Sequence, residues 1–248
     1  MHMTGNTILI TGGTSGIGLG LARRFHAEGN TVIIAGRREQ LLSSITAEHP
    51  GMDSVALDAA DPASIRRCFA KVTEKHPDLN VIINNAGIML SEDLTDPDHL
   101  RVAEETVATN LLGPIRLLAE AVPFLAGQTA AVIVNVSSGL GFVPLPITPT
   151  YCATKAAVHS FTQSLRVQLA STDVQVVELI PPGVQTDLMG QAASGRGMPL
   201  PAFLTEVMDI LRSYPDVVEV CVKDVLPLRH AEAQGRHDDM LAMLSGAH

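Results

Sequence analysis

The segment TGGTSGIG, residues 11–18, joins a short β-branched run to an amphipathic helical pattern at 16–30. Gly12 permits a tight turn, Gly16 lets backbone approach a phosphate, and Gly18 allows close helix-to-strand packing. A helix that begins here directs free N–H groups and a positive dipole end at an anion. The spacing G-x-x-x-G-x-G differs from the general dinucleotide fingerprint, so a plain turn is the alternative. A strand before it and a helix after it favour a pyrophosphate-binding loop.

The rest of the chain alternates strand and helix patterns about every 25 to 30 residues, which is typical of βαβ units. The strand patterns are apolar throughout, so both faces of the sheet are expected to be covered. We predict a single-domain, doubly wound Rossmann fold over 1–248, an α/β fold with a parallel sheet of about seven strands. Strands are expected at 7–11, 31–36, 54–58, 80–87, 130–138, 174–183 and 217–222, and helices at 16–30, 38–48, 61–76, 97–126, 150–171 and 201–213.

Composition restricts the possible partners. The 248 residues are 46% hydrophobic, enough for one large domain, and the net charge of −9 argues against nucleic acid or anionic membrane as a partner. Cys68, Cys152 and Cys221 form no C-x-x-C pair and the nine histidines show no ligand spacing, so we expect neither disulfide nor metal. No apolar run approaches the roughly 18 residues of a membrane span. The first strand follows at once, so we expect no signal peptide and a cytoplasmic protein.

The end of the second strand selects among nicotinamide cofactors. Binding of NAD usually requires an acidic residue there to hold the ribose 2′-hydroxyl. Here Gly36 takes that place, and Arg37 and Arg38 follow. A guanidinium suits a 2′-phosphate, so we predict NADP, as NADPH or its oxidised form, over NAD. The alternative is that these are two surface arginines at the start of a helix.

The segment TPTYCATKAA, residues 148–157, places one of the two tyrosines of the chain four residues before a lysine. In a helix, Tyr151 and Lys155 lie one turn apart on the same face. A phenol held beside an ammonium becomes a proton donor with a lowered pKa. The alternative is a tyrosine that only packs against the sheet.

Six motifs occur in order along the chain: TGGTSGIG (11–18), NNAG (84–87), Asn110, VSS (136–138), YCATK (151–155) and PPGVQTDL (181–188). Together they closely resemble those of the short-chain dehydrogenase/reductase family, in its compact branch of about 250 residues. The resemblance covers roughly residues 5 to 190. The longer stretches NTILITGGTSGIGLGLARRF, VSSGLGFVPLPITPTYCATKAA and VKDVLPLRHAEAQG further resemble one sub-branch, named after oxidoreductases of the Dlt operon.

The resemblance implies a catalytic role for four residues. Tyr151 would be the acid–base group and Lys155 would lower its pKa and bond the nicotinamide ribose. Lowering a phenol pKa from about 10 to about 7 requires roughly 4 kcal/mol, which the ammonium and an oxidised nicotinamide would supply together. Ser138 would orient the substrate oxygen, and Asn110 would anchor a water that relays protons to Lys155. Each has a structural alternative: packing, a helix cap or turn, or a helix irregularity.

The resemblance also implies the cofactor contacts. Asp58 would meet the adenine beside Ala59, and Val184 would bind the carboxamide through its backbone. Ser15 departs from the pattern, because many NADP-dependent members carry a basic residue there. The expected cofactor-binding set is Gly12, Thr14, Ser15, Gly16, Ile17, Gly18, Arg37, Arg38, Asp58, Ala59, Asn84, Ala86, Gly87, Tyr151, Lys155, Pro182, Gly183, Val184 and Thr186.

The predicted function is an NADP(H)-dependent oxidoreductase that transfers hydride between the nicotinamide and a small carbonyl or alcohol substrate. The pocket is expected to be apolar, framed by Met89, by 139–145 and by a mobile loop at 188–203, with Phe203 at its end. The usual family ending is absent, yet the helices at 97–126 and 150–171 suit a homodimer or homotetramer. The alternatives are a non-catalytic protein that senses NADPH or binds a partner, and an extended-branch epimerase or dehydratase.

Overall fold

Seven parallel strands form the centre of the molecule, in a computed structural model that describes residues 1–190, 195 and 197–246. The strands are β1 (Thr7–Thr11), β2 (Thr31–Gly36), β3 (Asp53–Ala56), β4 (Val81–Asn84), β5 (Val132–Val136), β6 (Gln175–Ile180) and β7 (Glu219–Cys221). Their order is β3-β2-β1-β4-β5-β6-β7, so the direction of winding reverses between β1 and β4. Ligands bind at such a reversal in open α/β sheets. The predicted doubly wound fold is confirmed.

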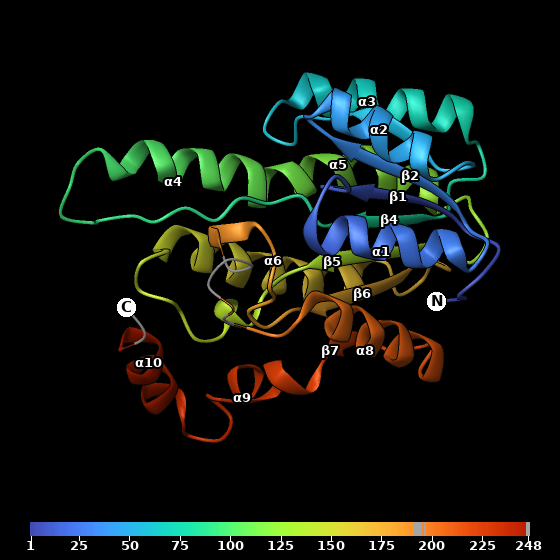
Figure 1. Cartoon of the computed structure of the whole chain (residues 1–248). Coiled ribbons are helices and arrows are strands. Elements are labelled where there is room, and N and C mark those ends of the chain that lie inside the picture. The colour runs from blue at the N-terminus through green and yellow to red at the C-terminus, as the bar shows by residue number, and fades with distance from the viewer. Residues whose placement is uncertain (191–194, 196, 247–248) are drawn as a thin grey trace.

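Helices cover both faces of this sheet, as Figure 1 shows. They are α1 (Gly16–Ala27), α2 (Glu39–Glu48), α3 (Pro62–Lys75), α4 (His99–Val107), α5 (Gly113–Leu125), α6 (Pro149–Gln168) and α8 (Leu200–Ser213). Ile8 and Ile10 of β1 belong to one buried cluster with α1, α2 and α8. Leu9, between them, belongs to the cluster on the opposite face with α3, α5 and α6. Side chains alternate along a strand, so a strand that is apolar at every position serves both layers.

The predicted helix at 97–126 is divided into α4 and α5 by one π-helical turn, η1 (Ala108–Leu112). α5 begins at Gly113, directly after this turn. An ideal Cβ on Gly113 would lie 2.7 Å from the Ala59 carbonyl, so the helix approaches the end of β3 closely. The start of α5 therefore packs against the segment that carries the predicted cofactor contacts Asp58 and Ala59.

The segment after β7 is folded, although its sequence is polar. After β7 the chain forms η4 (Lys223–Val225), α9 (Leu226–Arg229) and α10 (His237–Ser245). Met240 of α10 and Ala231 form a small buried cluster with Val143. A helix this short is marginal by itself and gains its stability from such packing, which the local sequence does not reveal.

Two further expectations concern the loop at 188–203 and the lack of a membrane span. Residues 191–194 and 196 of the loop expected at 188–203 lie outside the described residues. Among the helices that the structure does describe, none has the length and apolar character needed to cross a membrane.

Candidate active site

The glycine loop after β1 has the backbone that its sequence predicts. Gly12 and Gly16 have φ values of +67° and +54°, a region that L side chains rarely adopt. α1 begins at Gly16, so its free N–H groups face the cleft at the end of β1. An ideal Cβ on Gly18 would lie 2.4 Å from the Gly12 carbonyl oxygen and from Asn85 Nδ2. Gly18 therefore serves close packing rather than contact with a ligand.

Thr11 and Asn85, which were not among the predicted site residues, hold this loop against the end of β4. Asn85 Nδ2 donates to the carbonyls of Thr11 at 3.0 Å and Gly12 at 3.3 Å. In return the Thr11 hydroxyl accepts from the backbone N–H groups of Asn85 and Ala86, each at 3.0 Å. The available signal was a second asparagine directly after a buried strand, a position where a side-chain amide commonly satisfies backbone groups.

A cleft of about 360 Å³ runs along the carboxyl ends of β1 to β4. Arg38 Nη2 donates to the hydroxyls of Thr14 at 2.7 Å and Ser15 at 3.0 Å, so this guanidinium lies beside the glycine loop. Most of the predicted cofactor contacts share this one cleft. Its lining includes Gly12, Thr14, Ser15, Gly16, Ile17, Arg37, Arg38, Asp58, Ala59, Ala86, Gly87 and Thr186.

A second cavity, of about 90 Å³, adjoins the cleft and shares Ile17, Asn85, Gly87, Thr186 and Leu188 with it. It holds the predicted catalytic group at the carboxyl ends of β5 and β6. Its lining includes Ser138, Tyr151, Lys155, Pro182, Gly183 and Val184. The structure thus brings together three of the four predicted catalytic residues next to the predicted cofactor cleft.

Ser138, Tyr151 and Lys155 reach the cavity from two elements. Ser138 follows β5 and caps η2 (Gly139–Gly141), where its Oγ accepts from Leu140 N at 3.1 Å. Tyr151 and Lys155 lie one turn apart on α6, which begins at Pro149, a residue well suited to a first helical turn. Lys155 Nζ donates to the Val136 carbonyl at 2.8 Å. The helix is therefore fixed to the end of β5 by the lysine itself.

Burial dominates the electrostatics of this group. Burial raises the pKa of Tyr151 to about 12, against the lowering effect of the Ser138 side chain. Burial also lowers the pKa of Lys155 to about 8, and the charge of Glu178 opposes that change. In the protein alone the phenol is therefore not acidified by the ammonium, contrary to the sequence-based expectation. The reason is that both groups lose hydration, while Nζ lies 5.6 Å from the ring centroid and is bonded to a carbonyl.

Asn110 and Asn84 lie near the site but do not line either of these cavities. Asn110 is buried in η1, and its amide accepts from Ile88 N and donates to Ile88 O, each at 2.8 Å. Asn84 donates to Asn135 Oδ1 at 2.9 Å across the sheet. Both side chains are engaged with protein groups, so in this structure they position backbone and neighbouring side chains.

The apolar frame of the cavity is only partly as predicted. Met89 and Leu188 line it, and Leu145 packs against the cluster of Met89 with Tyr151. Phe203 of α8 is instead fully buried in the main core, so the prediction that it frames the pocket was wrong. It lies at the fourth position of α8, whose apolar face packs on the sheet.

Comparisons with known proteins agree with this geometry. A sequence profile of the short chain dehydrogenase family matches residues 6–197. The chain is 42% identical over 199 residues to the "Uncharacterized oxidoreductase DltE" of Bacillus subtilis, which covers 80% of this chain and 79% of that protein. The fold is similar to that of 3-ketoacyl-(acyl-carrier-protein) reductase from Brucella melitensis complexed with NADH, with a TM-score of 0.78 and 27% identity over 91% of this chain and 100% of that one. It is also similar to the closed form of serine dehydrogenase complexed with NADP+, with a TM-score of 0.75 and 25% identity over 82% and 88%.

The chain therefore belongs to the short-chain dehydrogenase/reductase family and is an NAD(P)-dependent oxidoreductase. Within this family its similarity assigns it to the branch of the DltE-like oxidoreductases. Both levels of the sequence resemblance are confirmed.

Proposed function

We propose that the chain transfers hydride between NADP(H) and a small carbonyl or alcohol substrate, with Tyr151 as the general acid and base. The observation that carries this proposal is the convergence of Ser138, Tyr151 and Lys155 on one small cavity beside the glycine-loop cleft. A nicotinamide, when bound, supplies or accepts the hydride. The residues of the chain hold the substrate oxygen and move its proton.

In the reducing direction the carbonyl carbon gains a hydride and its oxygen gains the proton from Tyr151 Oη. The pKa of about 12 keeps that proton on the phenol at neutral pH, so the side chain is ready to act as an acid. Ser138, which lines the same cavity as the phenol, would orient the same substrate oxygen. Lys155 would stabilise the phenolate left behind, because a cation nearby favours ionisation.

The end of β2 supports NADPH over NADH. Gly36 offers no carboxylate, and an ideal Cβ there would lie 3.1 Å from Thr14 Cγ2, so little space is left for an acidic side chain. Arg37 and Arg38 line the cleft at this point and are exposed. Their guanidinium groups suit bidentate contact with a 2′-phosphate.

Turnover with a defined cofactor tests the proposal. The protein would be titrated with NADPH and NADH, and a panel of ketones, aldehydes and alcohols would then be screened for cofactor oxidation or reduction. We expect tighter binding of NADPH and turnover of at least one apolar carbonyl compound. Tight NADPH binding without turnover on a broad panel would favour the non-catalytic sensor.

We further propose that the chain is a homodimer or a higher oligomer. Leu100 of α4 and Val167 of α6 have relative exposures of 57% and 76%, and Leu112 of η1 is also exposed. Such apolar side chains on neighbouring helices favour a covered surface. Light scattering over a range of concentrations tests this, and a mass that stays at 26.3 kDa would contradict it.

A further inference from the structure

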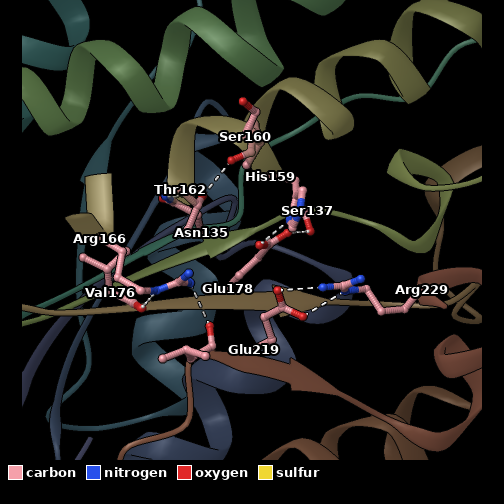
Figure 2. A network of polar contacts seen from close by, with 12 residues as sticks. Asn135, Ser137, His159, Ser160, Thr162, Arg166, Val176, Glu178, Glu219 and Arg229 are labelled. Carbon is pink, nitrogen blue, oxygen red and sulfur yellow. Dashed lines mark hydrogen bonds and ion pairs between the residues drawn. The ribbon is translucent and has the colours of Figure 1, made fainter. Parts of the chain in front are cut away.

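Glu178 of β6 is a carboxylate in the core of the sheet, with no side-chain exposure. It stands between apolar residues of its strand, Val177 and Leu179. A carboxylate is costly to bury unless it is paired and hydrogen-bonded. Its oxygens are both engaged: Oε1 accepts from the Ser137 hydroxyl at 2.5 Å, and Oε2 is 2.8 Å from Nδ1 of His159 (Figure 2).

Both partners of Glu178 are next to the catalytic group. Ser137 directly precedes Ser138, and the peptide group between Val136 and Ser137 provides the carbonyl that accepts from Lys155 Nζ. His159 lies on α6 one turn after Lys155. Glu178 therefore ties the end of β5 to the stretch of α6 that carries the catalytic lysine.

Lys155 itself takes part in none of the ion pairs found among the described residues. Its side chain is buried, and its hydrogen-bond acceptor is a neutral carbonyl. A buried ammonium without a contacting carboxylate depends on charges a few ångströms further away, which act strongly where water is excluded. Glu178 is such a charge, and it raises the pKa of Lys155 against the effect of burial.

We propose that Glu178 is a positioning residue of the active site, the buried counter-charge that keeps Lys155 an ammonium and holds it at the end of β5. The inference rests on the proposed role of Lys155. Glu178 does not touch the cavity; it acts through Ser137, His159 and the field at Nζ.

Other charged or titratable groups surround Glu178, and each contributes to the pH dependence of the Lys155 charge. Lys155 and His159 face it from α6, with Arg166 further along that helix near β7. Glu219 and Cys221 approach from β7, and Arg229 from α9. Arg229 forms two hydrogen bonds to Glu219, at 2.8 and 3.0 Å, and so compensates that charge, whereas no arginine in the described part of the chain pairs with Glu178 (Figure 2).

His159, Glu178 and Glu219 also bring possible metal-ligand atoms within 4.8 Å of one another. Each of these atoms already has a protein partner, and the Arg229 guanidinium repels a cation at Glu219. The cluster is therefore interpreted as a hydrogen-bonded network around Glu178. The sequence had shown no such grouping, because its members come from α6, β6 and β7.

The direct test is the titration of Lys155 by NMR. The chain has four lysines, and Lys71, Lys75 and Lys223 are exposed, so the signal of Lys155 in protein with ¹³C-labelled lysine is assigned by its loss in Lys155→Met. In Glu178→Gln, which keeps the shape of the side chain, we expect the proton affinity of Lys155 to fall about tenfold, or one pKa unit. An unchanged lysine titration would overturn the proposal.

Glu219→Gln is the matched control. It removes a carboxylate from the same register of the next strand, where Glu178 pairs with Glu219, and the charge that acts on the pKa of Lys155 is that of Glu178, not that of Glu219. We expect the Lys155 titration to stay unchanged in this variant, and an equal shift in both variants would contradict a specific role for Glu178. If Glu178→Gln does not fold, Glu178→Asp and Glu178→Asn form a second isosteric pair that differs only in charge.

The pH dependence of kcat distinguishes the role of Glu178 from the proposed function of the chain. With a substrate in hand, Glu178→Gln should move the alkaline limb of the kcat profile about one pH unit lower, since the ammonium is then lost earlier. A normal profile together with a shifted lysine titration would leave the electrostatic link intact and refute the catalytic role of the Lys155 charge. Absence of turnover in the native chain would refute the proposed function while the titration still decides the role of Glu178.

Discussion

Lys155 Nζ and the ring of Tyr151 lie on the same face of α6, and the nitrogen is 5.6 Å from the ring centroid. The ammonium donates to the Val136 carbonyl and not to the phenol. The proposed effect of the lysine on a Tyr151 phenolate would therefore be exerted through its charge and not through a hydrogen bond. Burial disfavours the charged form of each group, which explains why the pKa of Tyr151 rises to about 12 and that of Lys155 falls to about 8.

The first prediction concerns the cofactor. Arg37→Ala and Arg38→Ala should each weaken NADPH binding about 10- to 100-fold, the equivalent of one lost charge-assisted hydrogen bond, and leave NADH binding unchanged. Isothermal titration calorimetry measures both affinities. Arg66→Ala is the control, because Arg66 is exposed on α3 and does not line the cleft. Equal loss of both cofactors would contradict recognition of a 2′-phosphate.

Gly18 offers a test of the loop packing. The added methyl group of Gly18→Ala would lie 2.4 Å from the Gly12 carbonyl oxygen, and backbone cannot yield as a side-chain end can. We expect the free energy of unfolding to fall by about 1–3 kcal/mol and cofactor affinity to fall with it. Urea denaturation gives the first quantity. Gly127→Ala, where the nearest atom is the Phe124 carbonyl oxygen at 3.5 Å, should be close to neutral.

The buried lysine makes the stability of the fold depend on pH. Because the pKa of Lys155 is lowered to about 8 from 10.5, the unfolded chain binds this proton between those values and the folded chain does not. The contribution of this group to the free energy of unfolding therefore rises with pH in that window, by at most about 1.4 kcal/mol per pH unit.

Comparison with Lys155→Met isolates this effect, since methionine does not titrate. Urea denaturation at pH 8 to 9.5 gives the free energy of unfolding of both proteins, and we expect the native protein to gain stability relative to the variant as the pH rises. Tyr151 stays protonated in the folded protein over this range, because its pKa is raised to about 12. If the free energy of unfolding of the native protein, relative to that of Lys155→Met, falls with pH over this range, Lys155 is not buried as the structure has it.

Local patterns predicted the sheet and the glycine loop well, because each strand and turn is encoded in adjacent residues. The runs at 7–11 and 31–36 became β1 and β2 with the same bounds. The positive φ values of Gly12 and Gly16 follow from a turn that only glycine adopts at low cost.

What the local sequence did not reveal depends on contacts distant in the chain. Glu178 stands within an apolar strand, and its partners Ser137 and His159 come from two other elements. The folding of α10 depends on the packing of Met240 against Val143. The loss of hydration that dominates the pKa of Tyr151 likewise arises only when α6 packs on the sheet.

The central claim is tested most directly by turnover in Tyr151→Phe, measured beside cofactor affinity. The account predicts that kcat falls about 10²- to 10⁴-fold, the usual contribution of a general acid, while NADPH binding is retained. Tyr214→Phe is the matched control, because the second tyrosine of the chain is 66% exposed and lines neither of the two cavities. Native-like turnover in Tyr151→Phe would contradict the assignment of the proton donor.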